Sequence, residues 1–368
     1  MQKNCLNCRV EFVEDVFGES PKLAEVLADL GGEAGMPRVL IVADANVVQR
    51  TEGLGARIGK YVQTHGITLA GSPVVLSGGE KIKADNLQSA LKVMSAALDV
   101  RLGKSDCILA IGGGSLLDVA GYAAAQVRGG VRIVRMPTTP AAMIDAAFAD
   151  YAAVDSMSVK DALRVPSVAA AVVIDLAFAK TVLDGVWRGG IGEAVRLASV
   201  TDGTLMKKLV KWADAYRSRD LDVLAEMVKA AVAVRAKKGS TDFAEWCAMR
   251  LESISGYKLP HGYAVAIAIC VDASYAVEKG YLKAKDKDLI CGVLETCGAL
   301  DGLVHSQHTL GQPERVLCGL DAWNLSAASP GIVLPVGVGK SMVDGTPDRS
   351  AYEKVLKSLS TLAPAPEI

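Results

Sequence analysis

Five short apolar runs, separated mostly by helix-length segments, constrain the fold of this chain more than any other feature. The runs lie between residues 38 and 176 and read RVLIVAD, SPVVLSG, CILAIGGG, VRIVRMP and AAAVVID. Segments 46–65, 84–103 and 116–127 lie between them and are long enough to form crossover helices. This alternation predicts a mostly parallel sheet covered by helices on both faces. We therefore expect an α/β domain over residues 1–176, with one amphipathic stretch at 11–30 before the first strand.

Residues 177–368 predict a second, helical domain, because β-branched runs give way there to helical periodicity. Glycine or proline separates the predicted helices, which span 177–179, 192–200, 204–216, 220–235, 243–255, 263–279, 285–297 and 313–320. One extended run, GIVLPVGVGK, interrupts them late in the chain. The predicted fold class is α/β, with an N-terminal parallel-sheet domain and a C-terminal all-helical domain.

Composition excludes several classes of function. The 40 basic and 41 acidic side chains give a net charge of -1, so no global field attracts nucleic acid or an anionic membrane. No segment holds the ~18 uninterrupted apolar residues that span a bilayer, and the first residues lack a basic region followed by an apolar stretch. We expect a cytoplasmic protein with reduced cysteines. Cys5 and Cys8 have the spacing of zinc ligands, but no second pair follows at a suitable distance.

A glycine cluster, Gly112 to Gly114, follows one strand candidate and opens a helix that we expect Ser115 to cap. Glycines let a backbone approach a ligand closely, and a helix N-terminus offers free N–H groups to a pyrophosphate. The run is not a GxGxxG fingerprint, so a tight strand–helix turn without a ligand is the alternative. Polar clusters end three other strand candidates, at the edge where parallel sheets bind ligands: Asp44 with Asn46, Gly78-Gly79-Glu80 with Lys83, and Pro137-Thr138-Thr139.

The order of these motifs resembles that of the sugar-phosphate cyclases, a family that includes 3-dehydroquinate synthase. The resemblance covers roughly residues 38–343 and rests on VADAN, SGGEKIK, GGGSLLDVAGYAAAQVRGG, MPTT, MIDAA, GIGEAVRLAS and LPHGYAVAIAI. Within that family, AMRLESISGYKLPHGYAVAIAICVDASYAVEKG and the later IVLPVGVGK are most similar to cyclase-like proteins encoded in bacterial ebo-type clusters. Iron-containing alcohol and glycerol dehydrogenases share the GGGSxxD segment, but MID after the PTT run favours the cyclases.

The resemblance implies NAD as a cofactor, a small phosphorylated polyhydroxy substrate and a homodimer. The positions that match the family's NAD-binding residues are Asp44, Asn46, Glu80, Lys83, Gly113, Gly114, Asp118, Thr138 and Thr139.

The resemblance also implies a divalent metal of the zinc or cobalt type, held by Glu193 and His261. Glu245 and Met249 stand where the family has two histidines, so Glu245 would be the third ligand. We expect this metal to bind weakly or not at all, because a carboxylate replaces an imidazole and a supporting histidine is lost. Without the resemblance, Glu193 is simply favourable in the first turn of a helix, and His261 could cap the helix that follows.

The residues at the positions expected to bind the substrate, here called the substrate half, depart further from the family. Tyr151 and Asp155 stand where a lysine and an asparagine are expected, and Arg196 replaces a lysine and cannot give up a proton. Four residues remain as candidates for catalysis and anion binding: Asp145, Arg196, Arg128 and Lys340. The spacing of His305 and His308 predicts a solvated loop.

These observations favour an NAD-dependent, metal-assisted lyase that eliminates phosphate from a sugar phosphate, with a divergent substrate site and little capacity for true dehydroquinate synthesis. Two alternatives stay open. One is an NAD-dependent polyol dehydrogenase, and the other is a nucleotide-binding partner that has lost catalysis.

Overall fold

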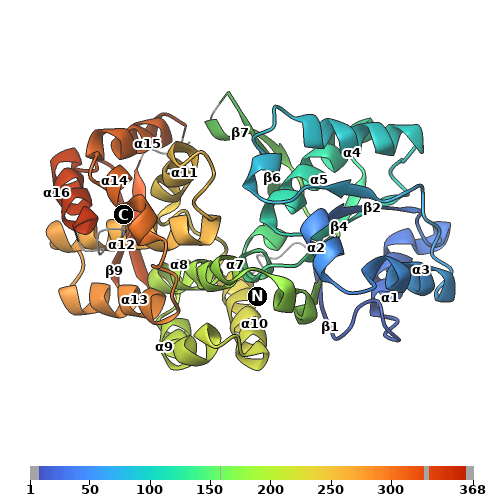
Figure 1. The fold of residues 1–368 in the computed structure, drawn as a ribbon, viewed down its shortest axis with the longest axis horizontal. Helices are drawn as coiled ribbons and strands as arrows, with labels where there is room; N and C mark the ends of the chain where they lie inside the picture. The colour runs from blue at the N-terminus through green and yellow to red at the C-terminus, as the bar shows by residue number, and fades with distance from the viewer. Residues whose placement is uncertain (1–7, 158, 327–330, 362–368) are drawn as a thin grey trace. The chain divides into compact units, whose positions relative to one another are not determined.

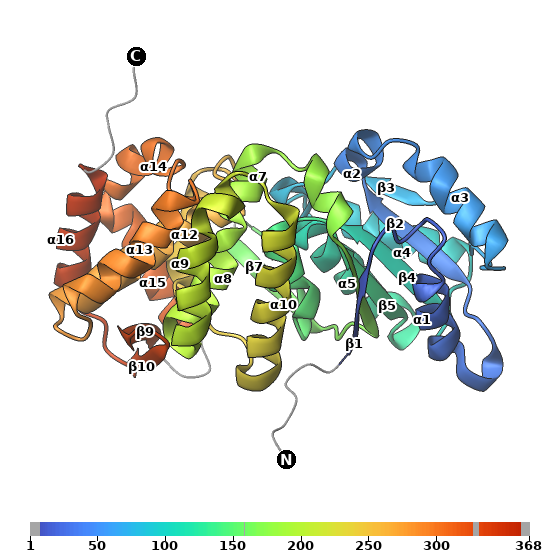
Figure 2. The same cartoon turned by 90° about the horizontal axis from the view of Figure 1, so that it is seen from below.

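The computed structural model describes residues 8–157, 159–326 and 331–361, so Cys5 of the predicted zinc pair lies outside the described residues. These residues divide into two compact units, with the boundary between Val182 and Leu183. Figures 1 and 2 show the strands and helices of each unit from two directions. The predicted fold class, a parallel-sheet domain followed by a helical domain, is confirmed.

The first unit is built on a parallel sheet that has six strands in the described part of the chain, in the order β1-β8-β5-β4-β2-β3. All neighbouring strands pair in parallel. The strands are β1 (Arg9–Val13), β2 (Val39–Asp44), β3 (Val74–Leu76), β4 (Cys107–Gly112), β5 (Arg132–Pro137) and β8 (Ala171–Asp175). Five were predicted. β1 was not, because this short edge strand is only partly buried and its sequence, RVEFV, lacks a continuous apolar run.

Helices cover both faces of the sheet. They are α1 (Lys22–Gly31), α2 (Ala45–Arg50), α3 (Leu54–Thr64), α4 (Gln88–Asp99), α5 (Gly114–Gln126) and α6 (Pro140–Ile144), with five 3₁₀ turns at Gly32–Ala34, Glu80–Ile82, Val127–Gly129, Ala146–Phe148 and Leu176–Thr181 among the described residues. Alternate residues of β2 and β4, such as Ile41 and Leu109, pack against α1 and α3. The intervening residues face the side that carries α4 and α5. Burial on both faces explains why these strands read as unbroken apolar runs.

A two-stranded hairpin lies outside the sheet and was not predicted. β6 (Tyr151–Ser156) pairs antiparallel with β7 (Val159–Pro166), and β6 packs on α5. Charged residues interrupt both strands, and β7 is exposed or half-buried, so a continuous apolar run is missing.

The second unit is helical apart from one hairpin, β9 (Ile332–Gly337) with β10 (Lys340–Asp344), which contains the predicted extended run. Its helices are α7 (Asp184–Gly189), α8 (Ile191–Thr201), α9 (Gly203–Arg217), α10 (Leu221–Lys238), α11 (Glu245–Ile254), α12 (His261–Glu278), α13 (Ala284–Thr296), α14 (Leu303–Leu310), α15 (Pro313–Ser326) and α16 (Arg349–Ser360). The loop predicted for His305 and His308 is wrong, because both residues lie on α14. None of the described helices is both long enough and apolar enough to cross a bilayer.

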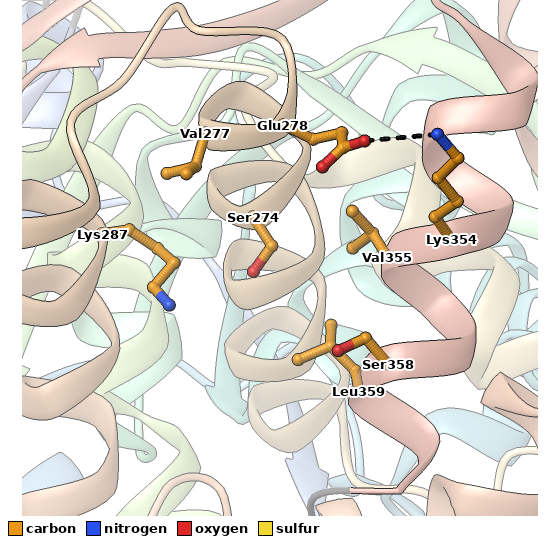
Figure 3. A pocket seen from close by; sticks show the side chains of 8 residues that line it. All are labelled: Ser274, Val277, Glu278, Lys287, Lys354, Val355, Ser358 and Leu359. Carbon is orange, nitrogen blue, oxygen red and sulfur yellow. Dashed lines mark ion pairs between the residues drawn. The ribbon is translucent and has the colours of Figure 1, made fainter.

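Helix α12 forms the centre of this unit and contacts α7, α8, α11, α13 and α16 (Figure 1). Its buried Asp272 accepts hydrogen bonds from the Trp246 indole (3.1 Å) and the Tyr352 hydroxyl (2.8 Å). The Tyr352 ring in turn stacks on Tyr275, with ring centroids 3.8 Å apart. This cluster ties α11 and α16 to the central helix. A surface pocket of about 330 Å³ lies beside it, lined by residues of α12, α13 and α16, including the Glu278–Lys354 ion pair (Figure 3).

Burial raises the pKa of Asp272 to about 7, despite its two hydrogen bonds, so this carboxyl group makes the fold sensitive to pH. The ordinary pKa of this carboxyl group is 3.8, so between pH 3.8 and about pH 7 Asp272 keeps its proton in the folded chain and loses it in the unfolded chain. Stability therefore falls as the pH rises. Relative to Asp272→Asn, the free energy of unfolding of the wild type should fall by ~1 kcal/mol per pH unit across this window. Urea unfolding at several pH values measures it, and parallel pH profiles for the two proteins would contradict it.

Candidate functional site

The glycine turn lies at the carboxyl end of β4, as predicted. α5 begins at Gly114, and Gly113 is its extended N-cap residue. Ser115 does not cap the helix, because it lies inside the first turn and its hydroxyl donates to Glu80. The first N–H groups of a helix have no partner within it, so this end of α5 can receive an anion.

Both glycines are also packed by the protein itself. A Cβ atom at Gly113 would lie 3.2 Å from Cγ2 of Thr139, and one at Gly114 would lie 3.1 Å from Cβ of Ala146. The close packing of Ala146 places the neighbouring Asp145 near the same turn. The structure therefore brings Asp145 and the glycine turn together, on the side where β4 and β5 end.

Asp44 and Asn46 meet at the ends of β2 and β3. Oδ1 of Asp44 accepts a hydrogen bond from the Asn46 backbone N–H (2.7 Å), and the Asn46 side chain donates to the Ser77 carbonyl (3.2 Å). Gly78 has a φ of +75°, and a Cβ there would lie 2.3 Å from the Asp44 carboxylate. A glycine is therefore required to bring this loop against Asp44.

Thr138 and Thr139 follow β5 and form different hydrogen bonds. Thr139 caps α6 by accepting from the Ala142 N–H. The Thr138 N–H donates to the carbonyl of Gly112 (3.0 Å), which joins the two loops. Its hydroxyl oxygen is buried and has no hydrogen-bond partner within the described residues. Buried polar atoms normally have a hydrogen-bond partner, so this hydroxyl group is suited to hydrogen-bond with a polar group of a ligand.

Lys83 is the centre of a buried charge network beside α5. Its ammonium group lies 2.6 Å from both Asp118 of α5 and Asp161 of β7. Nearby, Lys160 of β7 pairs with Glu80 (2.7 Å). Asp161 was not predicted as part of the site. The only indication in the sequence was an acidic residue directly after Lys160. These contacts tie the β6–β7 hairpin to the predicted nucleotide residues.

Burial opposes the charged forms of Lys83, Asp118 and Asp161. It lowers the pKa of Lys83, but the carboxylates of Asp118, Asp161 and Glu80 outweigh it and raise that pKa well above its usual range. Burial raises the pKa of Asp118, whereas the two lysines hold the pKa of Asp161 below its usual range. The lysine is thus a permanent cation.

Tyr151 and Asp155, the two replacements expected in the substrate half, lie on β6. Tyr151 is exposed and its ring stacks with the Arg164 guanidinium. Asp155 is buried and accepts from the Asp161 N–H (2.9 Å), so it holds the hairpin together. Its second carboxylate oxygen is buried without a partner among the residues described.

Arg128 is not brought to the glycine turn. It is exposed and lies in the connection after α5 that leads into β5, at the opposite end of that helix from Gly114. Helices in parallel α/β units return the chain to the other edge of the sheet, which explains the separation.

In the helical unit, Glu193 and His261 come together, although they are far apart in the sequence. Glu193 lies in the first turn of α8, and His261 begins α12. Nε2 of His261 lies 3.0 Å from Oε1 of Glu193. Two glycines permit this approach, because a Cβ at Gly262 would lie 2.4 Å from the backbone of Gly189.

A further carboxylate, Glu252, completes the surroundings of His261 and was not predicted. It is fully buried on α11, and its Oε1 lies 2.6 Å from Nδ1 of His261. Burial would lower the pKa of His261, but Glu252 and Glu193 outweigh this and raise it well above its usual range. Its contact with His261 joins two different helices, so no spacing in the sequence indicated it.

Arg196 occupies the space between the predicted metal ligands. Its Nη2 lies 2.9 Å from Oε2 of Glu193, and its Nη1 pairs with Oε2 of Glu245. The guanidinium group is buried, as is the Glu193 carboxylate. The structure therefore brings Glu193, Glu245 and His261 into one cluster, but with a cationic side chain inside it.

This arrangement does not fit a divalent metal ion. Arg196 engages the carboxylates of both predicted glutamate ligands, and a metal would have to displace it against like-charge repulsion. Across the described ranges, no three His, Cys, Asp or Glu side chains form a group that could hold a metal ion. The three-ligand site expected from the sequence is thus not present as an open site.

Lys340 is placed away from this cluster. It opens β10, and the adjacent Gly339 donates to the carbonyl of Ser199 in the last turns of α8 (2.8 Å). Glu193 lies in the first turn of the same helix, so the Gly339–Ser199 contact beside Lys340 is made at the other end of α8 from Glu193.

Comparison with known proteins gives consistent matches over most of the chain. Residues 73–188 match the family model described as 3-dehydroquinate synthase N-terminal, and residues 190–306 match the one described as 3-dehydroquinate synthase C-terminal. The 3-dehydroquinate synthase of Pyrobaculum islandicum is 30% identical over 273 residues, which cover 68% of this chain and 78% of the relative.

Solved structures share the fold. The 2-epi-5-epi-valiolone synthase of Streptomyces hygroscopicus, with NAD+ and Zn2+ bound, superposes with a TM-score of 0.83 at 22% identity, over 96% of this chain and 97% of that one. A 2-deoxy-scyllo-inosose synthase in complex with carbaglucose-6-phosphate, NAD+ and Co2+ gives a TM-score of 0.77 at 17% identity, over 95% and 96% of the two chains.

Removal of the Lys83 cation should destabilise the sheet unit strongly. Lys83→Met leaves Asp118 and Asp161 buried without their shared partner, which typically costs about 3–5 kcal/mol in free energy of unfolding. The control is Lys92→Met, because the Lys92 ammonium is exposed and bonds only a backbone carbonyl. Urea unfolding measures both. Similar losses in the two variants would show that the Lys83 network contributes little.

Proposed function

Because the chain belongs to the 3-dehydroquinate synthase family of sugar-phosphate cyclases, we propose that it is an NAD-dependent, cyclase-like lyase with a divergent substrate site. The substrate would be a small polyhydroxylated compound that carries a phosphate. Within the family, we place the chain nearest the ebo-type cyclase-like proteins and expect a cytoplasmic homodimer.

The observation that carries this proposal is the set of polar groups at the carboxyl ends of β2 to β5. The amino-terminal end of α5 offers Gly113 and Gly114 to a pyrophosphate. Asp44 and Asn46 end β2, where ribose hydroxyls are recognised in open α/β sheets. The buried hydroxyl of Thr138 needs a polar partner. Together with Thr139, Glu80, Lys83 and Asp118, these groups form the proposed NAD site.

NAD, when bound, would supply reversible hydride transfer, which allows a substrate carbinol to be oxidised transiently without net consumption of the cofactor. The intervening ketone acidifies the neighbouring C–H bond; its proton and the phosphate group leave, and a new carbon–carbon bond closes the ring after the hydride is returned. The net products are the cyclic compound and inorganic phosphate. Asp145, next to Ala146 at the glycine turn, would position the substrate.

The proton-carrying group of the helical unit is His261. Glu252 fixes its Nδ1 and Glu193 faces its Nε2, so the ring is held in one orientation with charged neighbours on both nitrogens. No step of the proposed reaction passes through a metal, because Arg196 lies where the ligands converge.

The divergence from 3-dehydroquinate synthesis is supported by the charges of the β6–β7 hairpin. Lys160 of β7 pairs with Glu80, and Tyr151 of β6 carries no positive charge. A lysine that neutralises a protein carboxylate contributes less to binding a substrate phosphate. The substrate half therefore suits a different polyol phosphate.

We predict that Gly113→Val abolishes NAD binding. Its side chain would fill the space between the α5 amino terminus and Thr139, where the phosphates are expected. Gly103→Val is the matched control, because a Cβ at Gly103 meets open space. Calorimetric titration with NAD+ compares the two, and circular dichroism checks that both fold. Equal affinity for NAD+ in a folded Gly113→Val variant would contradict the placement.

We also predict that the wild-type protein does not supply 3-dehydroquinate in a strain that cannot make it. Each positioned charge or acid–base group that is lost typically costs ~10²–10³ in rate. Rescue of growth at normal expression would contradict the divergent substrate site. Incubation with NAD+ and candidate sugar phosphates separates the remaining functions: a cyclase releases phosphate without net NADH, a polyol dehydrogenase accumulates NADH, and a non-catalytic partner does neither.

A further inference from the structure

We infer that Arg196 is a built-in cation that takes the place of a divalent metal, so that the Glu193–Glu245–His261 cluster works without a metal ion. This inference concerns metal binding in the helical unit alone, and it stands or falls independently of NAD binding and of the reaction proposed above.

The first support is the geometry of the guanidinium group. A planar guanidinium presents several donors in a fixed fork, which lets it contact two carboxylates at once. Arg196 uses Nη2 for Glu193 and Nη1 for Glu245, so one side chain joins α8 to α11. A divalent ion bound by these two glutamates would neutralise and join the same pair.

The second support is the charge balance within the cluster. Three carboxylates, those of Glu193, Glu245 and Glu252, surround the Arg196 guanidinium and the His261 ring. Buried carboxylates need such partners, because an unpaired charge in a low-dielectric interior is costly. The protein supplies a positive charge covalently, through Arg196, between the carboxylates of Glu193 and Glu245.

The third support is that His261 is already engaged on both ring nitrogens. Nδ1 faces Glu252 at 2.6 Å and Nε2 faces Glu193 at 3.0 Å. A metal needs a free lone pair on one nitrogen, together with other ligands that are open to it. Here the carboxylate that faces Nε2, that of Glu193, is shared between His261 and Arg196.

Removal of the guanidinium should therefore create a metal site. Arg196→Ala would leave Glu193, Glu245 and His261 around an empty space that carries excess negative charge. We expect this variant to bind one Co2+ per chain, at least ~100-fold more tightly than the wild type. The wild type should show no saturable Co2+ binding at this site. The matched control is Arg188→Ala, because Arg188 of the same unit forms only an exposed ion pair with Asp301.

The measurement is calorimetric titration of the purified full-length proteins with CoCl2, alongside the visible absorption of bound Co2+. Loss of the new binding in Arg196→Ala/His261→Ala would assign it to this cluster. Equal Co2+ affinity in the wild type and Arg196→Ala would overturn the inference. A folded Arg196→Ala variant that binds no Co2+ would also overturn it. If Arg196→Ala does not fold, Arg196→Gln is used in its place. Wild-type protein that is purified with one tightly bound metal ion per chain would refute the inference directly.

Discussion

The parallel direction of the sheet strands determines where the polar groups of the proposed nucleotide site gather. Because β2, β3, β4 and β5 point the same way, the loops that follow them share one edge of the sheet. The carboxyl ends thus gather Asp44, Glu80, Gly113 and Thr138 from segments that are far apart in the sequence. The same rule places Arg128 at the opposite edge, although it follows the glycine turn by a single helix.

The helical unit depends on close contact between backbones. Gly189 and Gly262 let α7 meet the start of α12, and this contact brings His261 against Glu193 on α8. A buried arginine then takes the position that the family resemblance assigns to a metal. The polar cluster of the helical unit is therefore built around Arg196.

The sequence predicted those parts of the fold whose signals are local. The central strands are buried on both faces, so each reads as a continuous apolar run, and glycine marks the turn into α5. The edge strand β1 and the β6–β7 hairpin lack such runs and were missed. Arg196 was recognised as a departure from the family, but its contact with Glu245 joins residues 49 positions apart, which no spacing rule reveals. Glu252 was missed for the same reason, since its partner His261 lies on another helix.

The central claim is that this chain keeps a working nucleotide site but has replaced a metal with Arg196. A crystal structure of the protein grown with NAD+ and CoCl2, with anomalous data collected at the cobalt edge, tests both halves at once. The account predicts density for NAD at Gly113 and Gly114 and no anomalous peak between Glu193 and His261. A cobalt peak there, with the Arg196 guanidinium displaced from the two glutamates, would contradict it.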